Sequence, residues 1–452
     1  MNKFNLAFYV KIKYGLHLIL TSYICYYSKD CCKDCCENFC NYLCNKKENN
    51  DIIIDNEEEN SDIIINNVEK NSNIIINKGK ENNDIIINND IIINNNINNN
   101  INNNIHFFPL IGLNNIGSTC FMNAILQFLI HIPELSLYFL NEYPKDKEAL
   151  KSKNPNSPTK GNLPEAYYEV VSGVEKKSKE DVKNGNNSYN PQNFKEKLGE
   201  YNEQFKQYEA NDSKDLILYL LQTFHEELNY FGDQTAPTNI LPPNQNLREN
   251  AYNHFNLVYN TTDFSKISQL FYGTYENVIS CLKCKNNFYS YQKFEYISFS
   301  TFSYKNKDFD IMNGFKDIES KQLLKGDNKY NCNICKKLVE AETICKIINL
   351  PNYLILNIDY GKNKINDVKK LIFEHEIDLQ EYLSLYYGQK TKYKLVAICT
   401  HLGSSGPGGH YITFCLNKEN KKWYEFNDSN VNICEEKDIY KGSPYLLLYK
   451  MI

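Results

Sequence analysis

Large apolar side chains of varied shape are missing from positions 49 to 105 of this 452-residue chain. The stretch has no leucine, phenylalanine, tyrosine or tryptophan, and 22 asparagines and 18 isoleucines fill most of its 57 residues. Such a composition cannot interdigitate side chains into a packed core. An (Asp/Asn)-Ile-Ile-Ile unit recurs with an 11-residue period, beginning at Asp51, Asp62, Asn73 and Asp84. Consecutive isoleucines suit short, self-associating β segments rather than a coiled coil, and we predict a disordered low-complexity linker over residues 49–106.

The chain also has no run of basic residues. Lys plus Arg is 50 and Asp plus Glu is 55, and the stretch 49–105 carries 10 of those acids against 3 lysines, so the rest is close to neutral. A chain this close to neutral has no electrostatic footprint for phosphates, and we do not expect nucleic acid as a partner. Sixteen cysteines are too few for a disulfide-stapled small fold. We therefore expect a protein of the cytoplasm, the nucleus or both.

Residues 1–48 lack an apolar run long enough for a transmembrane helix. The apolar run from Tyr14 to Tyr27 is interrupted by His17, although the preceding Lys11 and Lys13 are also typical of a signal peptide. Seven cysteines crowd this segment, at positions 25, 31, 32, 35, 36, 40 and 44. Three interpretations fit: an unstructured tail, a palmitoylated string that associates with a membrane, or a secretion signal or metal cluster. We expect the unstructured tail and keep membrane association as an alternative.

A candidate nucleophile lies at Cys120. The preceding segment from Gly112 reads Gly-Leu-Asn-Asn-Ile-Gly-Ser-Thr, and apolar residues at helical spacing follow the cysteine. Cys120 is therefore expected at the start of a helix, where unpaired backbone amides and the positive end of the helix dipole favour a thiolate. A lone cysteine at such a place is commonly a small buried residue, so the catalytic interpretation needs a base elsewhere in the chain.

That base is provided by His410. Residues 393–400, 410–414 and 422–426 are predicted to be strands, and residues 401–409 between the first two are a Gly/Ser/Pro loop. His410 stands where the loop enters the second strand. Asn427 or Asp428, at the end of the third strand, could accept a hydrogen bond from its imidazole and orient the ring. The sequence does not decide between these two acceptors.

Two Cys-x-x-Cys pairs, Cys281 with Cys284 and Cys332 with Cys335, predict a metal site. Four thiolates at tight-turn spacing suit a closed tetrahedral Zn²⁺. Such a site has no open position for water, so the predicted zinc is structural. Four ordinary buried cysteines are the alternative.

These segments together resemble a known family. The segment 112–124 is similar to the cysteine box of the ubiquitin-specific proteases, and the segment 393–431 is similar to their histidine box, with Gly-Gly-His-Tyr at 408–411 and Trp-Tyr-Glu-Phe-Asn-Asp-Ser at 423–429. The two boxes occur in the right order, and the match spans about 110 to 450. The segment 211–228, for which Asp212 is a good N-cap and Asp215 a capping-box acid, is similar to a helix that follows the cysteine box in this family.

The resemblance implies an α+β fold with a papain-like cysteine protease core divided into a thumb, a palm and zinc-ribbon fingers. The catalytic domain would cover residues 107–452, with the thumb at about 107–262, the fingers at about 263–348 and the palm at about 349–452. It implies a deubiquitinase that cleaves the (iso)peptide bond after the C-terminal Gly-Gly of ubiquitin on protein conjugates. Ubiquitin and ubiquitinated proteins would be its partners, and no catalytic cofactor would be needed.

The resemblance also implies roles for single residues. Cys120 would be the nucleophile, His410 its base, Asn427 the third member of the triad with Asp428 beside it, and Asn115 a donor to the oxyanion. The loop 401–409 would cover a slot narrow enough to admit only Gly-Gly. A ubiquitin-binding scaffold that has lost turnover is the alternative to an active enzyme.

Overall fold

The structure, a computed structural model, describes residues 107–180, 187–232, 247–361, 368–384, 388–403 and 409–452, together with the backbone of strands before residue 77. Contacts within the chain divide it into two compact units, Met1–Ile105 and His106–Ile452.

In the first unit the structure describes only the backbone of five strands. Strand β1 (Asn5–Lys11) pairs antiparallel with β2 (His17–Tyr23). Three isoleucine-rich strands, β3 (Ile52–Ile54), β4 (Ile63–Asn67) and β5 (Ser72–Ile76), form an antiparallel sheet. The cysteines from position 25 to 44 lie outside the described residues. The predicted disorder of residues 49–106 and the predicted tail or anchor at residues 1–48 remain predictions.

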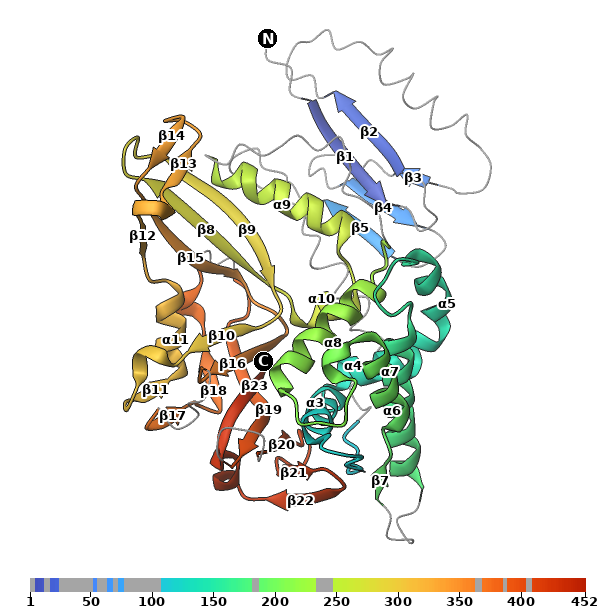
Figure 1. The fold of residues 1–452 in the computed structure, drawn as a ribbon. Helices are drawn as coiled ribbons and strands as arrows, with labels where there is room; N and C mark the ends of the chain where they lie inside the picture. The colour runs from blue at the N-terminus through green and yellow to red at the C-terminus, as the bar shows by residue number, and fades with distance from the viewer. Residues whose placement is uncertain are drawn as a thin grey trace. The chain divides into compact units, whose positions relative to one another are not determined.

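Helices make up most of the first half of the second unit (Figure 1). Cys120 begins a helix, as predicted, and all eleven residues of that helix are buried. This helical part is the thumb. In chain order the helices are α3 (Cys120–Ile130), α4 (Pro133–Asn141), α5 (Tyr143–Lys153), α6 (Asn162–Lys179), α7 (Gln192–Tyr201), α8 (Ser213–Glu227), α9 (Arg248–Thr262) and α10 (Lys266–Phe271).

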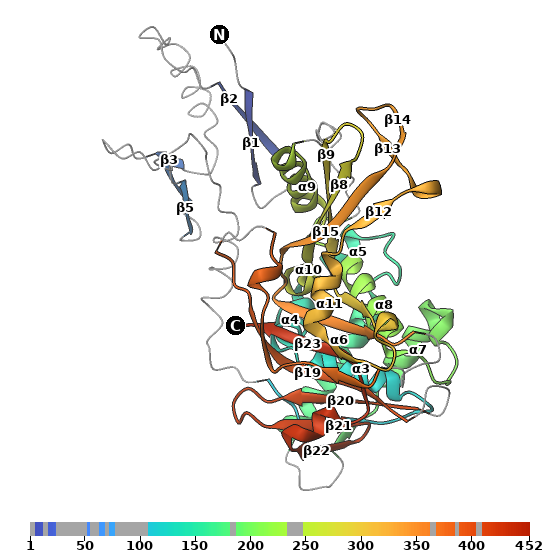
Figure 2. The same ribbon diagram turned by 90° about the vertical axis from the view of Figure 1, so that its left-hand side faces the viewer.

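A sheet of eight strands forms the palm. Its order is β10-β16-β23-β19-β20-β21-β22, with β18 paired to β19, and only the β10–β16 pair is parallel. Figure 2 shows β23, β19, β20, β21 and β22 following one another down the view. Helix α3 packs against β19, β20 and β21. The strands are β10 (Ile297–Ser300), β16 (Tyr353–Asp359), β18 (Glu376–Asp378), β19 (Lys392–Leu402), β20 (His410–Leu416), β21 (Trp423–Asn427), β22 (Asn430–Cys434) and β23 (Ser443–Met451).

The fingers are a four-stranded antiparallel sheet in the order β12-β15-β8-β9. Its strands are β8 (Gly273–Cys281), β9 (Asn287–Phe294), β12 (Gln322–Leu324) and β15 (Ala341–Asn349), and a hairpin of β13 (Tyr330–Cys332) and β14 (Lys337–Val339) lies at the tip. Helix α9 lies along β9. Arg248 at its start donates from Nε and Nη2 to the buried carboxylate of Glu276 at 2.5 and 2.6 Å, which ties the helix to β8.

Short elements complete the fold. Strand β6 (Gly112–Leu113) pairs in parallel with β7 (Ser188–Tyr189), which connects the segment before Cys120 to the thumb. Strand β11 (Asp308–Asp310) pairs in parallel with β17 (Lys370–Ile372) and is followed by helix α11 (Ile311–Ile318). A 3₁₀ turn, η2 (Glu203–Phe205), follows α7.

Two large apolar cores lie on opposite faces of the palm sheet. Side chains of a strand alternate between faces, and β16 shows this directly. Its Tyr353 and Ile355 belong to the core shared with the thumb helices, while Leu354 and Leu356 belong to the core on the other face. The palm sheet is therefore buried on both sides, which fixes the interior strands β20 and β21 that carry His410 and Asn427.

None of the single helices in the described ranges is long and apolar enough to cross a membrane, and α3 with α4 reaches that length only as a pair bent by 86°.

Candidate active site

The start of α3 presents Cys120 at the junction of thumb and palm. Its side chain is largely buried, and Thr119 precedes it at the N-cap position without capping the helix through its side chain. The Thr119 hydroxyl instead accepts a hydrogen bond from the Ile116 amide at 3.1 Å. Because the first amides of a helix have no partner within it, the sulfur lies next to N–H donors and the positive end of the dipole.

His410, the first residue of β20, is hydrogen-bonded to Cys120. Its Nε2 lies 2.8 Å from Oδ1 of Asn427, at the end of the adjacent strand β21. The amide oxygen is an acceptor, so Nε2 carries a proton and the other ring nitrogen serves the thiol. The hydrogen bond to Cys120 raises the pKa of His410 to about 9, burial opposes the rise, and the bond to Asn427 adds to it. The imidazole is therefore held as a cation against Cys120 at neutral pH.

Asp428 has different partners. It has a left-handed backbone (φ 50°), and its carboxylate accepts hydrogen bonds from Nδ2 of Asn115 at 2.9 Å and Nδ2 of Asn123 at 2.8 Å. Its backbone carbonyl accepts from the Leu113 amide at 2.8 Å. Asp428 thus connects the palm to the segment that precedes Cys120, and it acts on His410 only through its charge. Of the two acceptors that the sequence left open, Asn427 is the one that contacts the imidazole.

Asn115 is held from both ends of its amide. Its Oδ1 accepts from the backbone amides of Gly117 and Thr119, each at 3.1 Å, while one N–H of Nδ2 is directed to Asp428. The amide group has a second N–H, and the residue is exposed. The structure thus brings together all five residues proposed for catalysis: Cys120, His410, Asn427, Asp428 and Asn115.

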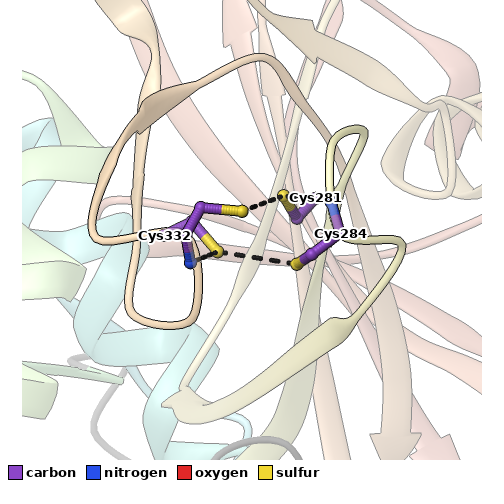
Figure 3. Close-up of side chains that lie close together, drawn as sticks. Cys281, Cys284 and Cys332 are labelled. Carbon is purple, nitrogen blue, oxygen red and sulfur yellow. Dashed lines mark hydrogen bonds between the residues drawn. The ribbon is translucent and has the colours of Figure 1, made fainter.

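The four cysteines of the two pairs meet at the tip of the fingers. Figure 3 shows three of them, Cys281, Cys284 and Cys332, with their side chains directed toward one another. All four sulfurs lie within 4.8 Å of one another, with Cys281 Sγ 3.9 Å from Cys335 Sγ and Cys284 Sγ 3.8 Å from Cys332 Sγ. A tetrahedron of sulfurs around zinc at about 2.3 Å has edges of about 3.8 Å, so these separations suit the ion.

The two pairs also have the same local backbone. In each, the amide of the second cysteine lies 3.4 Å from the sulfur of the first. The next residue, Lys285 or Lys336, is left-handed and donates its amide to the first cysteine's carbonyl at 2.9 or 2.8 Å. These matching turns aim four thiols at one point, and the cluster is consistent with a structural zinc site, as the sequence predicted.

Comparison with known proteins identifies the family to which this chain belongs. The model of the family "Ubiquitin carboxyl-terminal hydrolase" matches residues 111–449. The chain belongs to this family. Mouse ubiquitin carboxyl-terminal hydrolase 17-like protein B is 23% identical over 75% of this chain and 64% of its own length. Human ubiquitin carboxyl-terminal hydrolase 2 is 25% identical over 76% and 55%, and hydrolase 5 of Saccharomyces cerevisiae is 26% identical over 76% and 45%. The chain thus spans about half of the length of these relatives.

Solved structures agree on the fold of this ubiquitin carboxyl-terminal hydrolase family member. A chain of the SAGA DUB module of Ubp8, Sgf11, Sus1 and Sgf73 bound to monoubiquitin aligns with a TM-score of 0.57 at 22% identity, covering 82% of this chain and 77% of that one. The same module bound to ubiquitin aldehyde aligns with a TM-score of 0.56 at 21% identity, with the same coverage. The predicted family and the predicted fold with thumb, palm and fingers are confirmed.

One prediction about the histidine box is wrong in its boundary. Strand β19 runs through Leu402, so His401 is a buried strand residue and not the first residue of a loop. A Cβ atom at Gly409 would lie 1.8 Å from Nε2 of His401, so only glycine fits at 409, immediately before His410. The glycines and serines that follow His401 predict a loop from this residue onward, whereas the strand continues for two more residues. Residues 404–408 lie outside the described residues.

The helix α8 departs from its prediction in one detail. Asp212 is its N-cap, as expected, and accepts from the Lys214 amide at 2.8 Å. Asp215 does not complete a capping box, because its carboxylate accepts from Nε2 of Gln204 at 3.0 Å. The second oxygen of Asp212 accepts from the Tyr445 hydroxyl at 2.8 Å, which joins α8 to β23 of the palm.

Proposed function

We propose that this protein is a deubiquitinase, a cysteine hydrolase of the (iso)peptide bond that follows the C-terminal Gly-Gly of ubiquitin on protein conjugates. The observation that carries the proposal is the contact of His410 with both Cys120 and Asn427. In this arrangement the imidazole takes the thiol proton, and the resulting pair of thiolate and cationic imidazole, oriented by a third group, meets the requirement for nucleophilic attack on an amide carbonyl. Membership of the family and the solved neighbours described as bound to monoubiquitin and to ubiquitin aldehyde support ubiquitin as the partner.

Acylation follows from the geometry. The Cys120 sulfur attacks the carbonyl carbon of the terminal glycine, and negative charge moves onto the carbonyl oxygen. The unpaired amide at the start of α3 and the second N–H of Asn115 are the donors for that oxygen. His410 then gives its proton to the departing lysine amine, the C–N bond breaks, and a thioester joins Cys120 to ubiquitin.

Deacylation uses the same groups in reverse. His410 is neutral after it has protonated the amine, and it accepts a proton from water as the water oxygen attacks the thioester. The carbonyl oxygen again carries negative charge at the same donors. The C–S bond breaks, ubiquitin leaves with a free carboxylate, and the Cys120 sulfur regains the cationic His410 as its neighbour. Asn427 keeps the ring in one orientation through both steps.

Selectivity for Gly-Gly is supported by the close contact of Gly409 with His401. A Cβ at 409 would overlap the His401 ring, so the backbone before His410 packs closely against that ring. A slot bounded by such a backbone leaves room for glycine and excludes substrates with side chains at the last two positions. We therefore expect ubiquitin, or another modifier that ends in Gly-Gly, as substrate rather than general peptides.

The fingers would hold the zinc ion through Cys281, Cys284, Cys332 and Cys335. The ion would supply cross-linking of two turns and no chemistry at Cys120. The free thiols of the described residues, including Cys120 and the zinc ligands, favour action in the cytoplasm or nucleus. Membrane association through residues 1–48 stays a prediction, because those cysteines lie outside the described residues.

Hydrolysis of ubiquitin carrying a fluorophore in amide linkage at its C-terminus tests the proposed function. We expect release of the fluorophore by the full chain and none by Cys120→Ala. Binding of ubiquitin without release, by folded protein, would instead establish a scaffold without turnover. Repeating the assay with another modifier that ends in Gly-Gly would show how narrow the choice of substrate is.

A further inference from the structure

Lys195 is a buried cation whose contacts are to backbone carbonyls and an aromatic ring. It lies in α7 with 1% of its surface exposed, and burial lowers the pKa of its ammonium group. Among the described residues no carboxylate forms an ion pair with it. Its Nζ donates to the backbone carbonyls of Phe205 at 2.7 Å and Lys206 at 3.1 Å, and it lies 4.3 Å from the centre of the Tyr208 ring. A buried charge is costly unless its donors are used, and here all of its interactions go to one short segment.

The carbonyls and the ring that Lys195 contacts all belong to residues 203–208, the 203–208 segment. It begins with η2 and is drawn close to α7, because Gly199 has no side chain and a Cβ there would lie 2.9 Å from Cα of Lys206. Gln192 at the start of α7 donates from Nε2 to the Tyr208 hydroxyl at 2.8 Å. Helix α7 therefore fixes the 203–208 segment at both its backbone and its last ring.

The 203–208 segment contacts the chain on both sides of the nucleophile. The buried Phe205 ring stacks on that of Phe121, the residue after Cys120, with centroids 5.9 Å apart and planes 21° apart. The Tyr208 ring lies on Gly117, three residues before Cys120, where a Cβ would be only 3.2 Å from Tyr208 Cδ1. Gly117 has a φ of 119°, a conformation that glycine adopts without strain.

Gly117 in turn orients Asn115. Its amide donates to Oδ1 of Asn115, and the Thr119 amide donates to the same atom. With Oδ1 held in this way and one N–H directed to Asp428, the remaining N–H of the amide has a fixed direction. The position of the Gly117 backbone therefore sets where the oxyanion donor points.

We propose that Lys195 is a positioning residue for catalysis, which acts through the 203–208 segment and Tyr208 to hold Gly117 and thereby the oxyanion-binding amide of Asn115. This inference rests on the proposed function, because it concerns the oxyanion of that reaction. Lys195 touches neither substrate nor Cys120. Its effect should therefore fall on the stability of the oxyanion and not on binding of the ubiquitin body.

Lys195→Met tests the proposal, with Lys197→Met as the matched control. Lys197 lies in the same helix, is more exposed and pairs with Glu200 at 2.7 Å. We expect Lys195→Met to lower kcat for fluorophore release at least about tenfold, since oxyanion donors act on the barrier and must be aimed within a fraction of an ångström. KM should stay within about twofold, and Lys197→Met should match the wild type.

Two further readouts separate positioning from general damage. Ubiquitin aldehyde places an oxygen in the oxyanion site, so its affinity should fall with kcat, whereas alkylation of Cys120 by iodoacetamide needs no oxyanion donor and should keep its rate. If Lys195→Met folds poorly, Tyr208→Ala, at an exposed residue, provides the same test. It should lower kcat and the affinity for ubiquitin aldehyde and keep the iodoacetamide rate. Tyr208→Phe, which keeps the ring, should leave all three values unchanged.

Unchanged kcat and aldehyde affinity in folded Lys195→Met and Tyr208→Ala would overturn the proposal. An equal loss of the iodoacetamide rate would also overturn it, because the effect would then lie on the Cys120–His410 pair. A wild-type protein that does not bind ubiquitin aldehyde would refute the proposed function itself, and this inference with it.

Discussion

Asn427 and Asp428 are adjacent in sequence and serve different partners. Asn427 accepts from His410, whereas the left-handed backbone of Asp428 turns its carboxylate toward Asn115 and Asn123. The choice between them was beyond sequence reasoning, because either residue can accept from an imidazole and the backbone conformation alone directs the second one away. At this scale the site depends on two acceptors with separate tasks, one for the base and one for the oxyanion donor.

Asn427→Ala should lower the pH at which activity is lost on the alkaline side. The pKa of His410 is raised to about 9, so the cation is present below that value and disappears as the pH rises through it. The bond to Asn427 contributes to the rise, and without it the alkaline limb of kcat/KM should move to lower pH. Activity should fall less than in Cys120→Ala or His410→Ala, since the ring keeps its contact with Cys120. An unchanged alkaline limb would contradict the assignment of Asn427.

Asp428→Asn should damage catalysis and should move the alkaline limb less than Asn427→Ala does, because the charge of Asp428 is a smaller cause of the raised pKa of His410 than the bond to Asn427. A carboxylate offers acceptors to both Asn115 and Asn123, whereas an amide must place an N–H against one of their N–H groups. Asparagine also tolerates the left-handed backbone, so the change isolates the lost acceptor. We expect a roughly tenfold fall in kcat and in affinity for ubiquitin aldehyde. Asp438→Asn, which changes a carboxylate that pairs with Lys441 instead of with the site, is the control, and equal values for the two variants would count against this role.

The helices and strands hold the site residues in place through packing between segments that are far apart in the sequence. Helix α3 is buried between the other helices and the palm sheet, so Cys120 at its start is fixed relative to β20 and β21. The apolar spacing after Cys120 and the strand patterns around His410 allowed both elements to be predicted. The contact of the 203–208 segment with Gly117 could not be predicted, because it joins residues about 90 positions apart through shape and not through a local pattern.

The fingers should retain zinc independently of catalysis. The purified protein should contain about one zinc per chain by elemental analysis, and Cys284→Ser should lower both zinc content and the thermal unfolding temperature. Cys434→Ser, a free thiol outside the cluster, is the matched control. Alkylation of Cys120 by iodoacetamide should survive the loss of zinc. A metal-free purified protein, or loss of that alkylation, would contradict a structural zinc.

At the scale of the whole molecule, the family match covers residues 111–449 and leaves the first unit unassigned. The two motif boxes made the family predictable, because nucleophile, base and zinc ligands each sit in short segments with distinctive spacing. The composition of residues 49–105 predicted a low-complexity linker and gave no indication of a function for it. The near-neutral charge of the remaining chain suits a folded protein as partner better than a polyanion.

The central claim is that Cys120 attacks the C-terminal carbonyl of ubiquitin. Ubiquitin carrying an electrophile at its C-terminus, incubated with the full chain and followed by intact-mass and peptide mass spectrometry, tests it most directly. We predict a single covalent adduct on Cys120, absent in Cys120→Ala and much slower in His410→Ala. Folded wild-type protein that forms no adduct, or forms it on another cysteine, would contradict the account.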